Sequence, residues 1–136
     1  MVSIMKILFV CSGNAFRSPV AEAILKKYKP EIEVDSAGTN PSIPISSSAI
    51  NYLVSENAQR FLKQAPESLN EKKLNEYDLI IAMKPEHRFL ILRKCPECKD
   101  KIVVWDITDP YFLSIQDSEK IFKDIKSKVK ELIEKL

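Results

Sequence analysis

The sequence has few of the features that would direct it to a membrane, a nucleic acid or an oxidising compartment. No apolar run approaches the roughly 20 residues of a membrane-spanning helix. The formal net charge is only +2, which is too small to indicate a nucleic acid or a membrane surface as a partner. Three cysteines do not make a disulfide framework, and the first residues lack the layout of a signal peptide. We therefore expect a cytoplasmic protein.

Histidine is nearly absent as well, which limits the general bases that the chain offers. The only histidine, His87, lies near the start of an expected helix among charged residues, and this setting favours a surface position. It has no second histidine or nearby nucleophile in the sequence, so we do not assign it as a base. The chain does contain 45% hydrophobic and 29% charged residues, which is typical of one soluble globular domain spanning residues 1–136.

One short stretch, Cys11–Pro19, combines several features that point to chemistry. An apolar run precedes it and a helical pattern follows, with Pro19 at the expected first helical position, so the order predicts a strand, a tight loop and a helix. Such a loop turns backbone N–H groups inward beside the positive end of the helix dipole, and it can cradle a tetrahedral oxyanion. We expect phosphate or sulfate to bind at Ser12, Gly13, Asn14, Ala15, Phe16, Arg17 and Ser18.

The side chains of this loop suit the separate tasks of phosphoryl transfer. Arg17 can hold two oxygens of the anion with its planar guanidinium group. Cys11 is expected to be a thiolate aimed at phosphorus, with Ser18 donating a hydroxyl proton to the sulfur. Gly13 permits a tight turn or a close approach to the ligand, and Asn14 tolerates left-handed backbone geometry. The alternative, a buried cysteine beside a solvated arginine, fits a bare Cys-x5-Arg pattern better than it fits this stretch.

The stretch Cys11–Ile24 resembles the phosphate loop and first helix of the low-molecular-weight protein tyrosine phosphatase family, whose fold is shared with thioredoxin-coupled arsenate reductases. Three further stretches fall in the family's order, namely residues 35–39, 77–83 and 109–111. The resemblance implies that Ser36 braces the loop by bonding to Asn14. The family often extends this bracing with a histidine in the middle of the chain. This sequence has none there, so its network must be reduced or differently built.

The resemblance also assigns the general acid to Asp109, which begins an Asp-Pro-Tyr sequence after the last expected strand. Asp106 is the rival carboxylate, and the adjacent Pro110 and Tyr111 favour Asp109. Asp109 would protonate the departing phenolic oxygen and then act as base for the water that hydrolyses phosphocysteine. Tyr111, together with Phe112, would wall a slot for a flat phosphoaryl ring.

Two loop positions depart from the family's pattern. Ala15 stands where the tyrosine phosphatases often have a larger aliphatic residue and where phosphoarginine phosphatases tend to have threonine, so it favours neither substrate. Phe16 takes the place of a second cysteine that can protect the nucleophile through a reversible disulfide. We therefore expect Cys11 to overoxidise more readily than in relatives that carry this cysteine.

Cys95 and Cys98 form a lone Cys-x-x-Cys pair. The pair supplies at most two of the four ligands that a structural zinc site needs, and its place between a helix and a strand is unlike that of a redox motif. Three interpretations stay open at this point. The pair is a turn with two thiols, a stabilising disulfide, or a resolving pair for Cys11 as in arsenate reductases.

Strand and helix patterns alternate along the whole chain. Apolar or alternating runs at residues 5–10, 31–35, 78–83 and 101–105 predict strands, and amphipathic runs between and after them predict helices, including a short piece over residues 58–64. The expected fold is α/β in three layers, a four-stranded parallel sheet with helices on both faces and the phosphate-binding loop after the first strand.

These features lead us to expect a monomeric protein tyrosine phosphatase that acts on phosphotyrosine-containing proteins. Its catalytic residues would be Cys11, Arg17 and Asp109, with no metal and no cofactor. The alternatives are an arsenate reductase using Cys11 with Cys95 and Cys98, a phosphoarginine phosphatase, and a non-catalytic phosphate-binding module.

Overall fold

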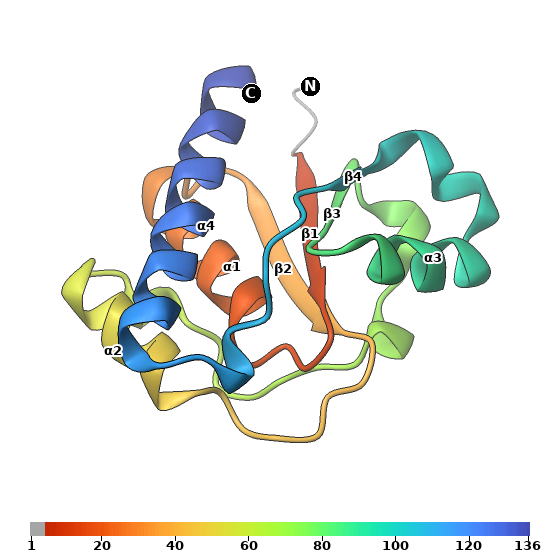
Figure 1. Cartoon of the computed structure of the whole chain (residues 1–136). Helices are drawn as coiled ribbons and strands as arrows, with labels where there is room; N and C mark the ends of the chain where they lie inside the picture. Colours follow the sequence, from red (N-terminus) through yellow and green to blue (C-terminus); the bar gives the residue numbers. More distant parts are fainter. Residues whose placement is uncertain (1–4) are drawn as a thin grey trace.

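Within the described part of the computed structural model, residues 5–136 apart from the side chain of Phe112, four parallel strands form one sheet in the order β2-β1-β3-β4 (Figure 1). The strands are β1 (Lys6–Cys11), β2 (Glu33–Gly38), β3 (Leu79–Ala82) and β4 (Ile102–Val104). β1 occupies a central position because its residues 7–10 present apolar side chains to both faces of the sheet. These four residues are fully buried. The predicted four-stranded parallel sheet is confirmed.

Helices cover both faces of this sheet and give the fold its three layers (Figure 1). They are α1 (Arg17–Tyr28), α2 (Ser47–Ser55), α3 (Pro85–Lys94) and α4 (Ile115–Lys135). Phe9 of β1 belongs to the core shared with α1, α2 and α4. Leu8 and Val10 belong to a second core with Ile91 of α3. Successive side chains of a strand point to opposite faces, so the apolar residues 7–10 of β1 serve both cores.

The candidate phosphate loop follows β1 at the point where the chain changes sides in the sheet. β2 pairs with one edge of β1, and β3 then pairs with the other edge. In open parallel sheets such a switch point, at the carboxyl ends of the strands, leaves a crevice in which ligands bind. Cys11 is the last residue of β1 and is in register with Gly38 at the end of β2. The loops at the lower edge of the sheet in Figure 1 therefore mark the place of the site.

The segment between α2 and β3 departs from the prediction. The expected helical piece over residues 58–64 is a single 3-10 turn, Gln59–Phe61, and Leu62 is already extended with φ −75° and ψ 135°. The chain then runs past β2, where the Gly38 N–H donates to the carbonyl of Glu67 at 2.8 Å. Long-range contacts of this segment with β2 and the phosphate loop thus prevail over its local helical pattern.

The remaining short elements are 3-10 turns at Leu69–Glu71, Leu74–Glu76, Pro96–Lys101 and Pro110–Phe112. Of the helices in residues 5–136, none combines the length and the apolar composition that a membrane crossing requires.

Candidate active site

Cys11 ends β1 with its side chain almost fully buried at the base of the loop. Its Sγ lies 2.9 Å from Ser18 Oγ and accepts the Asn14 backbone N–H at 3.3 Å. The following helix begins at Arg17. Pro19 was predicted to be the first residue of this helix, but it is the third. Its missing N–H is still harmless there, because the first-turn N–H groups have no partner within the helix.

Arg17 is buried and contacts two residues that follow β4. Its Nη1 donates to the carbonyl of Ile107 at 2.9 Å, and its Nη2 lies 3.5 Å from Asp109 Oδ2. Its Nε is buried and has no hydrogen-bond partner within residues 5–136. A buried guanidinium donor without a partner costs free energy, which a bound oxyanion would recover.

Asn14 holds the loop in shape from within. It has a positive φ of 54°, the left-handed conformation expected for it, and it is fully buried. Its Nδ2 donates to Ser18 Oγ at 2.8 Å and to Ser36 Oγ at 2.9 Å. Its Oδ1 accepts the Glu67 backbone N–H at 2.8 Å and the Lys63 ammonium at 3.0 Å. The hydrogen bond between Ser36 and Asn14 that the resemblance implied is present.

Lys63 is the part of this network that sequence reasoning missed. Its side chain is only 7% exposed, and its Nζ also donates to the Ser36 carbonyl at 2.7 Å and pairs with Glu67 at 2.6 Å. It stands in the middle segment where the network was expected to be reduced or differently built. A lysine in a polar stretch is usually a solvated residue, so the sequence holds no signal for its burial.

Two further charged residues, Glu22 and Lys72, complete the support beneath the loop. Glu22 on α1 is buried, accepts Ser36 Oγ–H at 2.5 Å and pairs with Lys26 one turn later. Burial alone would raise the pKa of the Glu67 carboxyl, but hydrogen bonds from Lys63 and Lys72 hold that pKa below its usual value. The loop thus rests on a cluster of paired charges and not on a single brace.

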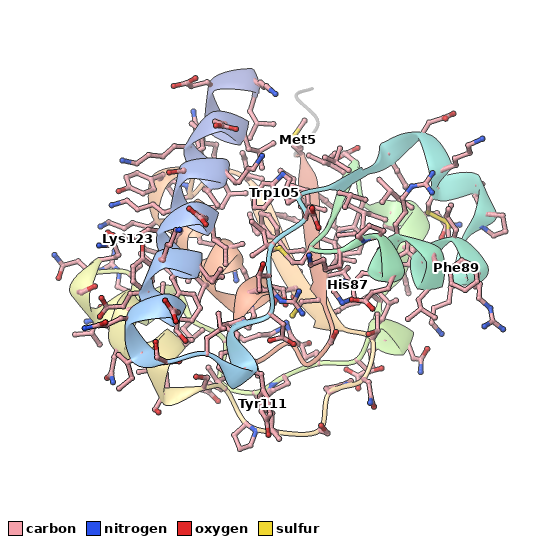
Figure 2. All side chains as sticks on the ribbon, viewed as in Figure 1. Met5, His87, Phe89, Trp105, Tyr111 and Lys123 are labelled. Carbon is pink, nitrogen blue, oxygen red and sulfur yellow. A yellow bond between two sulfur atoms is a disulfide. The ribbon has the colours of Figure 1, made fainter. Side chains whose placement is uncertain are left out.

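His87 is fully buried, and the predicted surface position is wrong. Its Nδ1 accepts the Lys84 backbone N–H at 3.0 Å, and its Nε2 lies 2.8 Å from Ser12 Oγ. Burial and the charge of Arg17 lower the pKa of His87 to about 4. The charged residues around it in the sequence lie on other faces of α3, and Figure 2 shows His87 between α3 and the sheet.

Asp109 lies at the mouth of the site, half-exposed and 3.5 Å from Arg17. Its Oδ1 accepts the Tyr111 backbone N–H at 3.1 Å, so the carboxylate caps the 3-10 turn that follows. The rival Asp106 points elsewhere, since its Oδ1 pairs with Lys84 Nζ at 2.8 Å. The geometry therefore brings Asp109, and not Asp106, to Arg17.

A cavity of about 230 Å³ opens above the cysteine. Phe16 and Tyr111 meet at its wall with their ring centroids 6.0 Å apart and their planes nearly perpendicular, and Tyr111 lies at the outer rim (Figure 2). The predicted wall residue Phe112 has a side chain outside the described part of the structure. The lining residues are Cys11, Ser12, Gly13, Ala15, Phe16, Arg17, Asn40, Ser42, Ile43, Asp109 and Tyr111.

The glycine that the loop needs for its packing is Gly38 and not Gly13. A Cβ at Gly13 would meet only Ala15 Cβ, at an ordinary 3.8 Å, so the turn itself does not require glycine there. A Cβ at Gly38 would lie 2.6 Å from the Ser12 carbonyl oxygen and 2.9 Å from the Asn14 nitrogen. The end of β2 therefore contacts the backbone of the phosphate loop directly.

Replacing Gly38 with alanine should displace the phosphate loop. We expect a loss of about 1–3 kcal/mol in the free energy of unfolding, as for overpacked sites. We also expect phosphatase activity to fall at least about tenfold, since small misplacements of catalytic groups are costly. Urea denaturation and turnover of para-nitrophenyl phosphate measure the two effects. In Gly13→Ala, the matched control, the free energy of unfolding should change by less than about 1 kcal/mol.

Cys95 and Cys98 are joined by a disulfide. Cys95 follows the last residue of α3, whose 10 residues lead away from the carboxyl end of β3 over about 15 Å. The pair also precedes β4, so it lies near the amino ends of the parallel strands, whereas Cys11 lies at a carboxyl end. This placement disfavours a resolving role toward Cys11.

Replacing both Cys95 and Cys98 with serine should leave phosphatase turnover within about twofold of the wild type. The reason is that the disulfide precedes β4, at the amino ends of the strands, whereas the phosphate loop follows β1 at a carboxyl end. The assay is kcat/KM for para-nitrophenyl phosphate under reducing and non-reducing conditions. A large loss of turnover in the double variant would contradict this expectation and indicate that the two cysteines act together with Cys11.

The fold and the site together define a class of protein. A cysteine at the end of the first strand and a buried arginine at the start of the next helix bound a loop at the switch point of a parallel sheet, and the Asn14 N–H of this loop points at the cysteine sulfur. The family model described as "low molecular weight phosphotyrosine protein phosphatase" matches residues 6–136. The chain belongs to this family, and the predicted resemblance is confirmed.

Individual relatives agree with this assignment. The chain is 33% identical over 113 residues to the low molecular weight protein-tyrosine-phosphatase Wzb of Escherichia coli strain K12, covering 77% of each chain. It is 29% identical over 147 residues to a protein-arginine-phosphatase of Bacillus subtilis, covering 97% of this chain and 94% of the relative. The solved structure of Vibrio vulnificus Wzb in complex with benzylphosphonate matches with a TM-score of 0.88 at 27% identity, covering 98% of this chain and all of that one.

Proposed function

We propose that the protein hydrolyses phosphotyrosine in proteins through a phosphocysteine formed on Cys11. The observation that carries this proposal is the pairing of a buried sulfur with a buried Arg17 whose Nε has no partner within residues 5–136. Both groups line the cavity of the loop, together with Asp109. A dianionic phosphate would supply the acceptor that Nε lacks.

The first chemical step is attack of the Cys11 thiolate on phosphorus. The hydroxyl of Ser18, 2.9 Å from the sulfur, and the Asn14 N–H stabilise the thiolate before attack. The bond from phosphorus to the ester oxygen breaks as the new bond forms, and Asp109 gives its proton to the departing oxygen. Arg17 and the loop amides stabilise the charge on the three transferring oxygens.

The second step returns the enzyme to its starting state. The Asp109 carboxylate takes a proton from a water molecule, which attacks the phosphocysteine and releases inorganic phosphate and the Cys11 thiolate. The 3.5 Å approach of Asp109 to Arg17 supports this role, because it holds the carboxylate over the anion loop. The exposed position of Asp109 gives it ready access to water.

An aromatic ester is the substrate that the mouth of the site fits best. The rings of Phe16 and Tyr111 stand at one wall of the cavity, where a phenyl ring would pack in an edge-on or offset arrangement. The complex of a relative with benzylphosphonate, a ring attached to a phosphate analogue, supports an aromatic substrate. Phosphoarginine is the second candidate, because a protein-arginine-phosphatase is 29% identical over nearly the whole chain.

Cys11→Ser should abolish turnover of para-nitrophenyl phosphate, since the serine hydroxyl is a far weaker nucleophile than a thiolate. The wild type is then assayed on matched peptides that carry phosphotyrosine, phosphoserine or phosphoarginine. We expect phosphotyrosine to give the highest kcat/KM. Equal turnover by the wild type and Cys11→Ser would refute the proposal, and a preference for phosphoarginine would replace the substrate but not the mechanism.

A further inference from the structure

The buried His87 and the hydroxyl of Ser12 form a polar pair that the mechanism above does not use. The pair joins α3 to the phosphate loop across 75 residues of sequence. A fully buried histidine is uncommon, and both of its ring nitrogens have partners here. The directions of these hydrogen bonds indicate a role beyond packing.

The partner on one side fixes the tautomer of the ring. The Lys84 backbone N–H can only donate, so the Nδ1 that it contacts at 3.0 Å carries no proton. The neutral ring must then carry its proton on Nε2. The lowered pKa of His87, caused by burial and by the charge of Arg17, keeps the ring neutral at physiological pH.

The proton on Nε2 in turn fixes the role of Ser12. At 2.8 Å, Nε2–H donates and Ser12 Oγ accepts, so the serine's own hydrogen is left for another acceptor. Within residues 5–136, Ser12 Oγ has no second hydrogen-bond partner. Ser12 lines the same cavity as Cys11 and Arg17, which is the place of the anion.

We propose that the Ser12 hydroxyl donates to an oxygen of the bound phosphate, and that His87 is the positioning residue that orients this hydroxyl. The inference rests on the proposed function only for the identity of the anion. Ser12 thereby adds a side-chain donor to the loop amides and Arg17. A donor held in place before the substrate arrives loses little entropy on binding.

The test uses one variant of Ser12 and a matched pair at His87. Ser12→Ala removes the donor. His87→Asn keeps an acceptor near the place of Nδ1 for the Lys84 N–H but does not reach Ser12, whereas His87→Gln reaches Ser12 with an amide N–H. Both replacements remove the ring, so the loss of packing is similar in the two.

Binding of inorganic phosphate, followed by calorimetry, and kcat/KM for para-nitrophenyl phosphate are the readouts. We expect Ser12→Ala to weaken phosphate binding at least about tenfold, as for a lost hydrogen bond to a charged group. His87→Asn should weaken it about threefold to tenfold, and His87→Gln should recover most of that loss. In the Ser12→Ala background, His87→Asn should have no further effect on binding, because the two residues act as a unit.

The inference is overturned if Ser12→Ala binds phosphate as tightly as the wild type. It is also overturned if the two His87 variants lose equal affinity, or if the effect of His87→Asn persists in full without the serine hydroxyl. These outcomes are separate from the fate of the proposed function. A wild type that binds phosphate but turns over no aryl phosphate would refute the phosphatase mechanism, and the comparison of phosphate affinities would still decide the role of Ser12.

Discussion

Asp109→Ala is expected to lower kcat about 10²–10⁴-fold on aryl phosphates with poor leaving groups, and far less on those with good ones. An oxygen that leaves as a stable anion needs no proton, whereas a basic phenolate does. The structure gives this carboxylate the right position, since it is half-exposed at the cavity and 3.5 Å from Arg17. The measurement is a series of substituted phenyl phosphates compared between the wild type and the variant.

The matched control for this experiment is Asp106→Ala. Asp106 is the neighbouring carboxylate, but it pairs with Lys84 and does not line the cavity. Its removal should leave the dependence on the leaving group unchanged. An equal loss on good and poor leaving groups in Asp109→Ala would show that Asp109 orients Arg17 and transfers no proton.

Lys63→Met is expected to lower the free energy of unfolding by about 3 kcal/mol, because it removes the cation from a buried charge network and leaves the partners of that cation uncompensated. The ammonium is the shared donor for Asn14 Oδ1, the Ser36 carbonyl and Glu67. Without it, two buried oxygens lose a partner, and Asn14 is held less firmly in its left-handed conformation. We therefore expect kcat for para-nitrophenyl phosphate to fall together with stability. Urea denaturation and steady-state kinetics measure the two quantities.

Lys29→Met provides the comparison, since the partly exposed Lys29 side chain at the end of α1 makes, within residues 5–136, only a 3.7 Å ion pair with Glu31. Exposed pairs of this kind contribute about 1 kcal/mol or less. If Lys63→Met is as stable and as active as Lys29→Met, the lysine does not support the phosphate loop. The brace would then consist of Asn14, Ser36 and the Glu67 N–H alone.

Local sequence predicts the core of the site well, because that core is built from one continuous stretch. The apolar strand, the loop from Cys11 and the helix after it are encoded within neighbouring residues, and all three form, although the helix begins at Arg17 and not at Pro19. The contact of Ser18 with Cys11 Sγ is also local and was predicted, whereas the bond from Asn14 to Ser18 was not. Asp109 and Ser36 are distant in the chain, and they were found only because their own short motifs resemble those of a known family.

The residues that sequence reasoning missed share a different property. Lys63 and His87 have no local pattern that distinguishes them from solvated residues, and each has a partner in the phosphate loop, 49 residues away for Lys63 and 75 for His87. Glu22 lies three residues after Pro19 on a helix whose first nine residues are all buried, so its burial depends on how tightly that helix is enclosed. In each case a polar side chain is buried because tertiary contacts supply its hydrogen-bond partners. Such contacts cannot be recognised from the neighbouring residues in the sequence.

The bond from Arg17 to the Ile107 carbonyl, 90 residues further along the chain, affects the order in which the protein becomes competent during synthesis. Domains fold as units while the ribosome extends them from the amino end. Cys11 and Arg17 are synthesised before Ile107, and the arginine has its anchor only after the fourth strand has joined the sheet. We therefore expect the nascent chain to expose the proposed nucleophile Cys11 before it can bind a phosphate productively.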